Sequence, residues 1–232
     1  MCPVTSANND ENLRIRANAD EIVQRLRDEY PLARTSLTHR NVYELLVATV
    51  LSAQTTDIRV NSVTPELFRR WPTPQALAQA AIPDVESVVH PLGFFRTKAR
   101  SIVGLAITLI EEFDGEVPED SSSLESLPGV GHKTANVVRG SWFGIPSLTV
   151  DTHVGRLSRR LGWSESKDPK VVERDVCTLL PDTDWTQLSL DLIEHGRAIC
   201  HSQSPTCDQC LLADLCPSAG MITTRARTRT KQ

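Results

Sequence analysis

Apolar residues recur every three or four positions in several stretches of the chain, with polar residues between them. This spacing places the apolar side chains on one face of an α-helix, so it predicts amphipathic helices. The positions that show it most clearly are Val42, Leu45, Leu46 and Val50; Ile102, Ala106, Leu109, Ile110 and Phe113; and Val172, Val176, Leu179 and Leu180. No stretch alternates convincingly as a strand would, and the sequence therefore predicts an all-α fold.

Prolines and capping residues indicate where the helices begin and end. Proline removes a backbone donor and clashes with the preceding turn, so prolines are expected to divide the chain into helix-length pieces. They are Pro65, Pro72, Pro74, Pro83, Pro91, Pro118, Pro128, Pro146, Pro169 and Pro181. Asn18 is the predicted N-cap of a helix that extends to Tyr30, and Ser122 with Glu125 fits a capping box.

Residues 127–135, with the sequence LPGVGHKTA, predict a tight turn between two helices, which we call the hairpin. The proline ends the first helix, Gly129 and Gly131 can take positive φ, and the second helix begins near His132. Glycine amides and a helix N-terminus together make a site for an anion, most simply a phosphate. Lys133 lies in the first turn of that second helix. The alternative interpretation is an ordinary helix–helix turn with a solvated lysine.

A second polar motif, Asp151-Thr152-His153, opens another predicted helix about twenty residues later. Asp151 is either the N-cap of this helix or a buried carboxylate close to Lys133. His153 is predicted to be a structural hydrogen-bonding partner. Three arginines on the same helix form either a solvated face or a set of phosphate contacts: Arg156, Arg159 and Arg160.

Four cysteines fall within seventeen residues near the C-terminus: Cys200, Cys207, Cys210 and Cys216. A disulfide framework is not expected in a reducing compartment. Four thiolates can hold either zinc or an iron–sulfur cluster. Because the surrounding segment has few strong core residues, a metal would also supply its order. Cys177 lies beside apolar helical positions and is predicted to be an inert core thiol.

The composition allows a sizeable core, since 40% of the 232 residues are hydrophobic. No apolar run reaches the roughly 20 residues of a membrane span. The polar first twelve residues lack the hydrophobic segment of a signal peptide. We therefore expect a cytoplasmic protein with reduced thiols and no membrane association.

The hairpin, the aspartate motif and the cysteine spacing, in this order, resemble the endonuclease III family of helix-hairpin-helix (HhH-GPD) DNA glycosylases. The resemblance extends from about Ile22 to Cys216. It implies a bifunctional DNA glycosylase and AP lyase of base excision repair, in which Lys133 attacks C1′ to form a Schiff base before β-elimination. Asp151 would stabilise the cationic sugar or deprotonate the lysine. The four cysteines would hold a [4Fe–4S] cluster rather than zinc.

The same resemblance implies the DNA contacts. The partner would be double-stranded DNA with a damaged or missing base, bound by a monomer associated with the bacterial nucleoid. Gln54 would enter the stack where the base has left, although capping alone explains its neighbours Thr56 and Asp57. Phe94 would be an apolar wedge against the opposite strand; otherwise residues 92–95 are an interhelical loop tucked into the core. In the hairpin, Gly129, Val130, Gly131 and His132 would bind the backbone.

The resemblance further implies two helical lobes that flank a DNA-binding cleft. Residues 35–145 would form a six-helix lobe with the helix-hairpin-helix motif. Residues 146–220 would form the iron–sulfur cluster lobe together with residues 1–34, and residues 221–232 would be a basic, disordered tail. Lys133 and Asp151 would then face each other across the cleft.

The charge departs from what a duplex-binding protein usually carries, because the net charge is −4 and the isoelectric point about 5.9. The tail contributes four positive charges, and without them 21 basic and 29 acidic residues leave a net charge of −8. These tail residues are Arg225, Arg227, Arg229 and Lys231. Residues 201–206 contain no lysine or arginine, and His132 stands where the family often has arginine.

Other functions stay open at this stage. A mismatch or pyrimidine-dimer glycosylase of the same superfamily would share most of these motifs. The adenine-mismatch branch lacks a lysine at the position of Lys133 and carries an additional C-terminal domain, for which this chain is too short. The acidic charge instead favours a weakly active or non-catalytic DNA-damage sensor, against which Lys133 and Asp151 argue.

Overall fold

The computed structural model describes residues 6–221, with side chains from residue 18 onward. Within this part the chain forms eleven α-helices and one 3-10 turn and no strand, which confirms the all-α prediction. Contacts between Cα atoms divide it into two compact units, Arg34–Ser147 and the chain up to Ala33 combined with the chain from Leu148 onward. No helix of the described residues is both long enough and apolar enough to cross a membrane.

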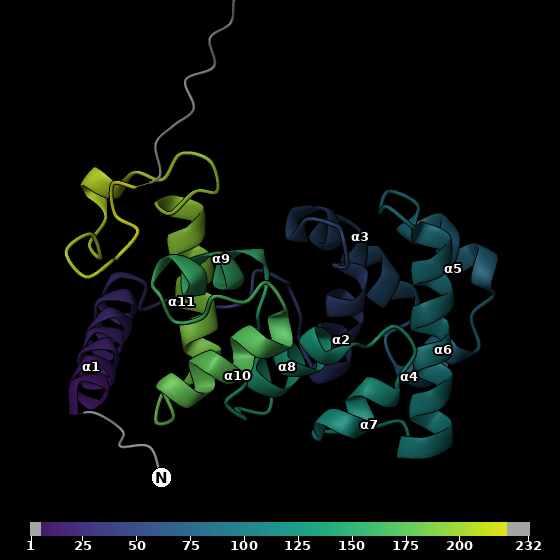
Figure 1. Ribbon diagram of the computed structural model, residues 1–232. Helices are drawn as coiled ribbons and strands as arrows, with labels where there is room; N and C mark the ends of the chain where they lie inside the picture. Colours follow the sequence, from purple (N-terminus) through teal and green to yellow (C-terminus); the bar gives the residue numbers. More distant parts are fainter. Residues whose placement is uncertain (1–5, 222–232) are drawn as a thin grey trace, which may run out of the picture. The chain divides into compact units, whose positions relative to one another are not determined.

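The unit of residues 34–147 holds seven helices, one more than the six expected, because short segments between the prolines also become helical. They are α2 (Val42–Leu51), α3 (Asp57–Arg70), α4 (Pro74–Ala78), α5 (Ile82–Val89), α6 (Phe95–Phe113), α7 (Ser121–Ser126) and α8 (His132–Ser141). Nine of the ten residues of α2 are buried, and α2 packs against α3, α6 and α8. The long helix α6 packs against α4 and α5 (Figure 1).

The second unit is built around α11, which packs against α1 and α9. Its elements are α1 (Ser6–Glu29), α9 (Thr152–Arg160), α10 (Pro169–Leu179), α11 (Trp185–Ala198) and the 3-10 turn Cys207–Gln209. The chain after α11, residues 199–221, is mostly turns, and we call it the cysteine segment. Arg25 of α1 anchors it by donating to Leu211 O at 2.9 Å and to Asp214 Oδ1 at 2.7 Å.

Several predicted helix boundaries are wrong. The first helix begins at Ser6, so Asn18 lies inside it rather than at its N-cap. Pro65 does not end a helix but lies within α3, whose buried face packs against the core on both sides of the proline. The capping box is also wrong, because Asp120 caps α7 and accepts from Ser123 N at 2.9 Å.

Candidate functional site

The hairpin connects α7 to α8 through a tight turn. Gly129 has φ 81°, and a Cβ added there would lie 2.8 Å from Ser101 Cβ, so both backbone conformation and space favour glycine. Val130 is 7% exposed and belongs to the core, which leaves only its backbone for a ligand.

Gly131 differs from Gly129 and from the prediction of positive φ. It is the N-cap of α8 with φ −108°, and a Cβ added there would meet nothing within 4 Å. The first intrahelical bond of α8 runs from Ala135 N to Gly131 O at 3.0 Å. The amides of the first turn therefore lack intrahelical acceptors, and Gly131 leaves open space beside them, as an anion site requires.

Lys133 occupies the first turn of α8, as predicted, and its side chain is exposed. Among the described residues of its own unit it forms no hydrogen bond or ion pair. Lysine at a helix N-terminus is unfavourable because the helix dipole opposes a positive charge there. An exposed amine in this place can act as a nucleophile towards a ligand bound at the N-terminus of α8.

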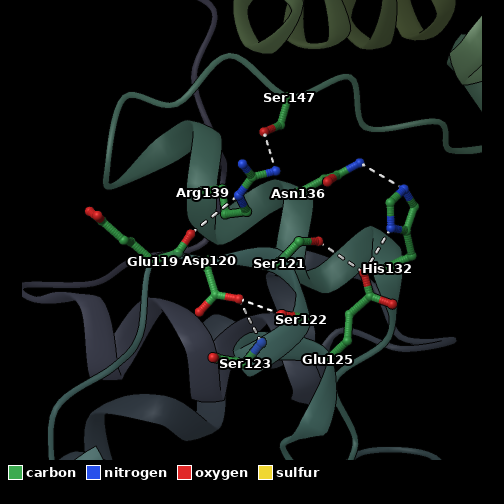
Figure 2. Close-up of polar contacts among 10 residues, drawn as sticks. All are labelled: Glu119, Asp120, Ser121, Ser122, Ser123, Glu125, His132, Asn136, Arg139 and Ser147. Atoms are coloured by element: carbon green, nitrogen blue, oxygen red, sulfur yellow. Dashed lines mark hydrogen bonds and ion pairs between the residues drawn. The ribbon is translucent and has the colours of Figure 1, made fainter.

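Beside Lys133, the His132 ring lies between two side chains (Figure 2). His132 Nδ1 is 2.9 Å from Glu125 Oε1, and His132 Nε2 is 3.4 Å from the amide of the buried Asn136. Glu125 also accepts from Ser121 Oγ at 3.0 Å. Glu125 thus links α7 to the first residue of α8, which is a structural role that its predicted capping function did not anticipate.

Asp151 is the N-cap of α9, as one of its two interpretations required. Its Oδ1 accepts from His153 N at 2.8 Å and from Val154 N at 2.9 Å. Both hydrogen bonds that it accepts from described residues end on this one oxygen. Capping therefore uses only Oδ1. The half-buried carboxylate can cap α9 through Oδ1 and interact with a ligand through Oδ2.

Gln54 and Phe94 share an unusual backbone conformation. Their φ values are 53° and 57°, in the left-handed region that non-glycine residues rarely enter. Both side chains are exposed, and Phe94 is 67% exposed although it is aromatic. The interpretation of residues 92–95 as a loop tucked into the core is thus wrong at Phe94, whereas Leu92 is 1% exposed. Thr56 is the N-cap of α3, but its side chain makes no capping hydrogen bond.

All four predicted metal-ligand cysteines line one pocket of the cysteine segment, together with apolar residues such as Leu157 and Leu212. No three His, Cys, Asp or Glu side chains of the described residues are grouped as around a single metal ion. In a [4Fe–4S] cluster each thiolate binds a different iron, so the thiols need only surround a shared pocket. The donor set fits the cluster.

Two arginines of α9 form hydrogen bonds with the cysteine segment and its junction with α11. Arg160 donates to His201 O at 2.8 Å and Ser202 O at 2.9 Å, and its Nη1 lies 3.0 Å from Cys200 Sγ. Arg156 donates to Cys200 O at 2.9 Å and to Gly196 O at 3.0 Å. Arg156 and Arg160 are therefore not a solvated face, because both are half-buried and donate to backbone carbonyls. No local sequence signal reveals this, because the acceptors lie about forty residues away.

A histidine that sequence reasoning missed also reaches the pocket. His195 is 1% exposed, with Nε2 3.4 Å from Cys210 Sγ and Nδ1 3.1 Å from the hydroxyl of Tyr30. Burial lowers the pKa of His195 to about 4, so its ring is neutral. His153 is likewise structural, as predicted, with Nδ1 3.1 Å from Arg156 Nη2. Burial raises the pKa of Cys177 to about 11, which agrees with an unreactive core thiol.

Comparison with known proteins is consistent across sequence and structure. Residues 47–182 match the family described as HhH-GPD superfamily base excision DNA repair protein. The chain is 50% identical over 205 residues to endonuclease III of Synechocystis sp., covering 88% of this chain and 94% of the relative. It is 38% identical to endonuclease III of Escherichia coli K12, covering 87% of this chain and 95% of that protein.

Solved structures agree with the sequence relatives. A trapped endonuclease III–DNA covalent intermediate superposes with TM-score 0.83 at 40% identity, covering 88% of this chain and 96% of that one. A non-covalent endonuclease III–DNA complex matches equally well. A thermostable thymine-DNA glycosylase, with TM-score 0.79 and 22% identity over 87% of this chain and 96% of its own, shares the fold.

Proposed function

We propose the function of this protein on the basis of its family, because the chain belongs to the HhH-GPD superfamily of base excision DNA repair proteins. Within it, the protein is a bifunctional DNA glycosylase and AP lyase of the endonuclease III type. The observation that carries this proposal is the exposed Lys133 in the first turn of α8, directly after the hairpin. Support comes from 40% identity to the protein in the trapped covalent DNA intermediate.

Lys133 is the nucleophile. The lone pair of Nζ attacks C1′ of the deoxyribose, the bond from C1′ to the base breaks, and the base leaves with the bonding electrons. Loss of a proton from nitrogen and opening of the sugar ring give a Schiff base. This acidifies C2′, and removal of a C2′ proton expels the 3′ phosphate, which cuts the strand 3′ to the lesion. Water finally releases the lysine.

Asp151 stabilises the cationic sugar that develops as the base departs. A preorganised charge of this kind typically contributes about 10²–10³ in rate. Oδ1 is held by two amides of α9, so the carboxylate has a fixed orientation while Oδ2 stays available. For this role, Oδ2 must approach the sugar that Lys133 attacks. In the same position Oδ2 can also accept the proton that the lysine amine loses.

The DNA contacts follow from the exposed turns. The target base must leave the stack before its glycosidic bond can be reached. Gln54 then fills the vacated place, and Phe94 wedges the opposite strand, since both project from left-handed turns into solvent. The backbone of Gly129, Val130 and Gly131, with His132, receives a phosphate at the N-terminus of α8.

Cys200, Cys207, Cys210 and Cys216 hold a [4Fe–4S] cluster in their shared pocket. When bound, the cluster would order the cysteine segment, and the chemistry proposed for Lys133 and Asp151 does not require it. Burial raises the pKa of the Cys210 and Cys216 thiols, and bound iron would supply the positive charge that favours their thiolate form.

Residues 35–145 form the lobe with the helix-hairpin-helix motif, and residues 146–220 with 1–34 form the cluster lobe. The protein acts as a monomer in the cytoplasm. The basic tail, residues 222–232, lies outside the described residues, and we propose that it contacts backbone phosphates.

Strand nicking on duplexes with defined lesions tests the proposal. Wild-type protein should nick a thymine-glycol duplex, whereas Lys133→Gln should release neither base nor strand. Asp151→Asn should lose about 10²–10³ in rate on the damaged base and less on an abasic site, where no base remains to be expelled. Binding without nicking by the wild-type protein would instead indicate a DNA-damage sensor.

A further inference from the structure

Lys98 lies where two exposed turns of the same unit meet. It is the fourth residue of α6, and its amide donates to Phe94 O at 3.0 Å, which closes the first turn of the helix behind Phe94. Its side chain is directed inward and the residue is only 5% exposed. Lys98 is therefore fixed to the Phe94 turn through the backbone.

The Lys98 ammonium also binds the other turn. Nζ donates to Thr55 Oγ1 at 2.5 Å, and Thr55 directly follows Gln54. Thr55 is part of the turn itself, since its amide donates to Ser52 O at 3.0 Å. One side chain thus joins the left-handed turn of Gln54 to the left-handed turn of Phe94, although the two turns are about forty residues apart in sequence.

Stability does not explain a lysine here. Among the described residues no carboxylate pairs with the ammonium, and burial lowers the pKa of Lys98. The first turn of α6 contains no acidic residue, so the helix dipole opposes the charge. A methionine has similar length and no charge to desolvate, and it would suit this core position better.

We propose that Lys98 is a positioning residue that holds the Gln54 and Phe94 turns together, so that both side chains enter the duplex as one unit. This inference rests on the proposed function. Extrusion of a base leaves a gap on one strand and an unpaired partner on the other. Two inserting groups held at a fixed separation fill both places without ordering each turn anew, which is the advantage of a preorganised site.

The test uses two substitutions that break the same contact. Lys98→Met removes the donor and Thr55→Val removes the acceptor, each with little change in size; Thr55→Val also removes a long hydrogen bond from Thr55 Oγ1 to Ala53 O at 3.4 Å. Thr56→Val is the matched control, because the Thr56 side chain makes no capping hydrogen bond. The thermal midpoint of Lys98→Met should equal or exceed that of the wild type, since a buried charge is lost.

Reaction rates should distinguish a positioning role of Lys98 from a purely structural one. On a thymine-glycol duplex, Lys98→Met and Thr55→Val should each lower kcat/KM roughly 10- to 100-fold, the effect of losing one hydrogen bond to a charged group. Cleavage of an abasic site should fall by less than about threefold, because no base has to be extruded. The double variant should be no worse than Thr55→Val alone, because the contact that Lys98→Met removes is already lost there.

A fluorescent readout reports insertion directly. With 2-aminopurine opposite the lesion, wild-type protein should raise the fluorescence as the base unstacks, Lys98→Met and Thr55→Val should not, and Thr56→Val should match the wild type. Equal losses on both substrates, additive effects in the double variant or an unchanged fluorescence rise would overturn the proposal. If Lys98→Met fails to fold, Thr55→Val decides alone. A wild-type protein that cleaves no lesion would refute the proposed function instead.

Discussion

The hairpin and the cysteine segment are both short, irregular and functional, yet they are ordered by different means. In the hairpin, Leu127, Val130 and Ala135 are at most 7% exposed, and Gly129 packs tightly against Ser101. In residues 199–221 only Leu212 is buried. The cysteine segment depends on hydrogen bonds from α9 and on what its thiols bind. A turn that packs itself keeps its shape without a ligand, whereas a segment without a core of its own does not.

The largest effect that this comparison predicts comes from the thiols. Cys207→Ala should lower folded yield severely, because cluster binding supplies a large part of a folding free energy that is only about 5–15 kcal/mol for a whole domain. Cys177→Ala is the matched control and should cost less than about 1 kcal/mol. Iron and sulfide content near four per chain in wild-type protein would support the cluster. Stoichiometric zinc in a colourless, anaerobic sample would exclude it.

Arg160 tests whether α9 anchors the cysteine segment. Arg160→Ala should destabilise the protein by about 1–2 kcal/mol, because it removes hydrogen bonds to the exposed carbonyls of His201 and Ser202. Arg174→Ala removes only a surface pair with Asp175 and should change stability by less than about 0.5 kcal/mol. Thermal unfolding followed by cluster absorbance measures both. Equal midpoints for the two variants would mean that the segment does not need Arg160.

The two glycines test the hairpin. Gly129→Ala should cost about 1–3 kcal/mol, because alanine must adopt φ 81° and its Cβ would lie too close to Ser101. Gly131→Ala should cost less than about 1 kcal/mol, since it changes only the residue at an N-cap. Its methyl group should nevertheless weaken duplex binding by filling the space beside the first amides of α8. Chemical denaturation and a binding isotherm separate the two effects, and a strongly destabilised Gly131→Ala would contradict this distinction.

The smallest effect concerns the tail that follows the cysteine segment. Deleting residues 222–232 should weaken binding to all duplexes alike, and each lost phosphate contact should reduce the slope of log K against log salt by ~0.9. Affinity measured at several salt concentrations tests this prediction. An unchanged slope would mean that the tail makes no phosphate contact.

Sequence reasoning succeeded where a local signal fixes the structure. The start of α8, the place of Lys133 and the cap at Asp151 were all predicted, because glycine, proline and capping residues act on their own backbone. Sequence reasoning failed where contacts with other parts of the chain determine where a helix begins or ends. Pro65 stays inside α3 because the buried face of that helix continues on both sides of the proline, and Asp120 rather than Ser122 caps α7.

The candidate site shows the same division. The cysteine spacing indicated a shared pocket, whereas Arg160 and His195, which also line it, come from two other helices, α9 and α11. Lys98 also gave no sequence signal, since a lysine in a helix is normally solvated. Its importance follows only from the buried contact with Thr55.

Covalent trapping of Lys133 tests the central claim most directly. Borohydride reduces a Schiff base to a stable amine, so wild-type protein should become joined to damaged DNA, and peptide mapping should place the adduct on Lys133. Lys133→Gln keeps the length and polarity of the side chain but has no nucleophile, so trapping should vanish while the melting temperature is unchanged. Robust trapping by Lys133→Gln, or an adduct on another amine, would contradict the account.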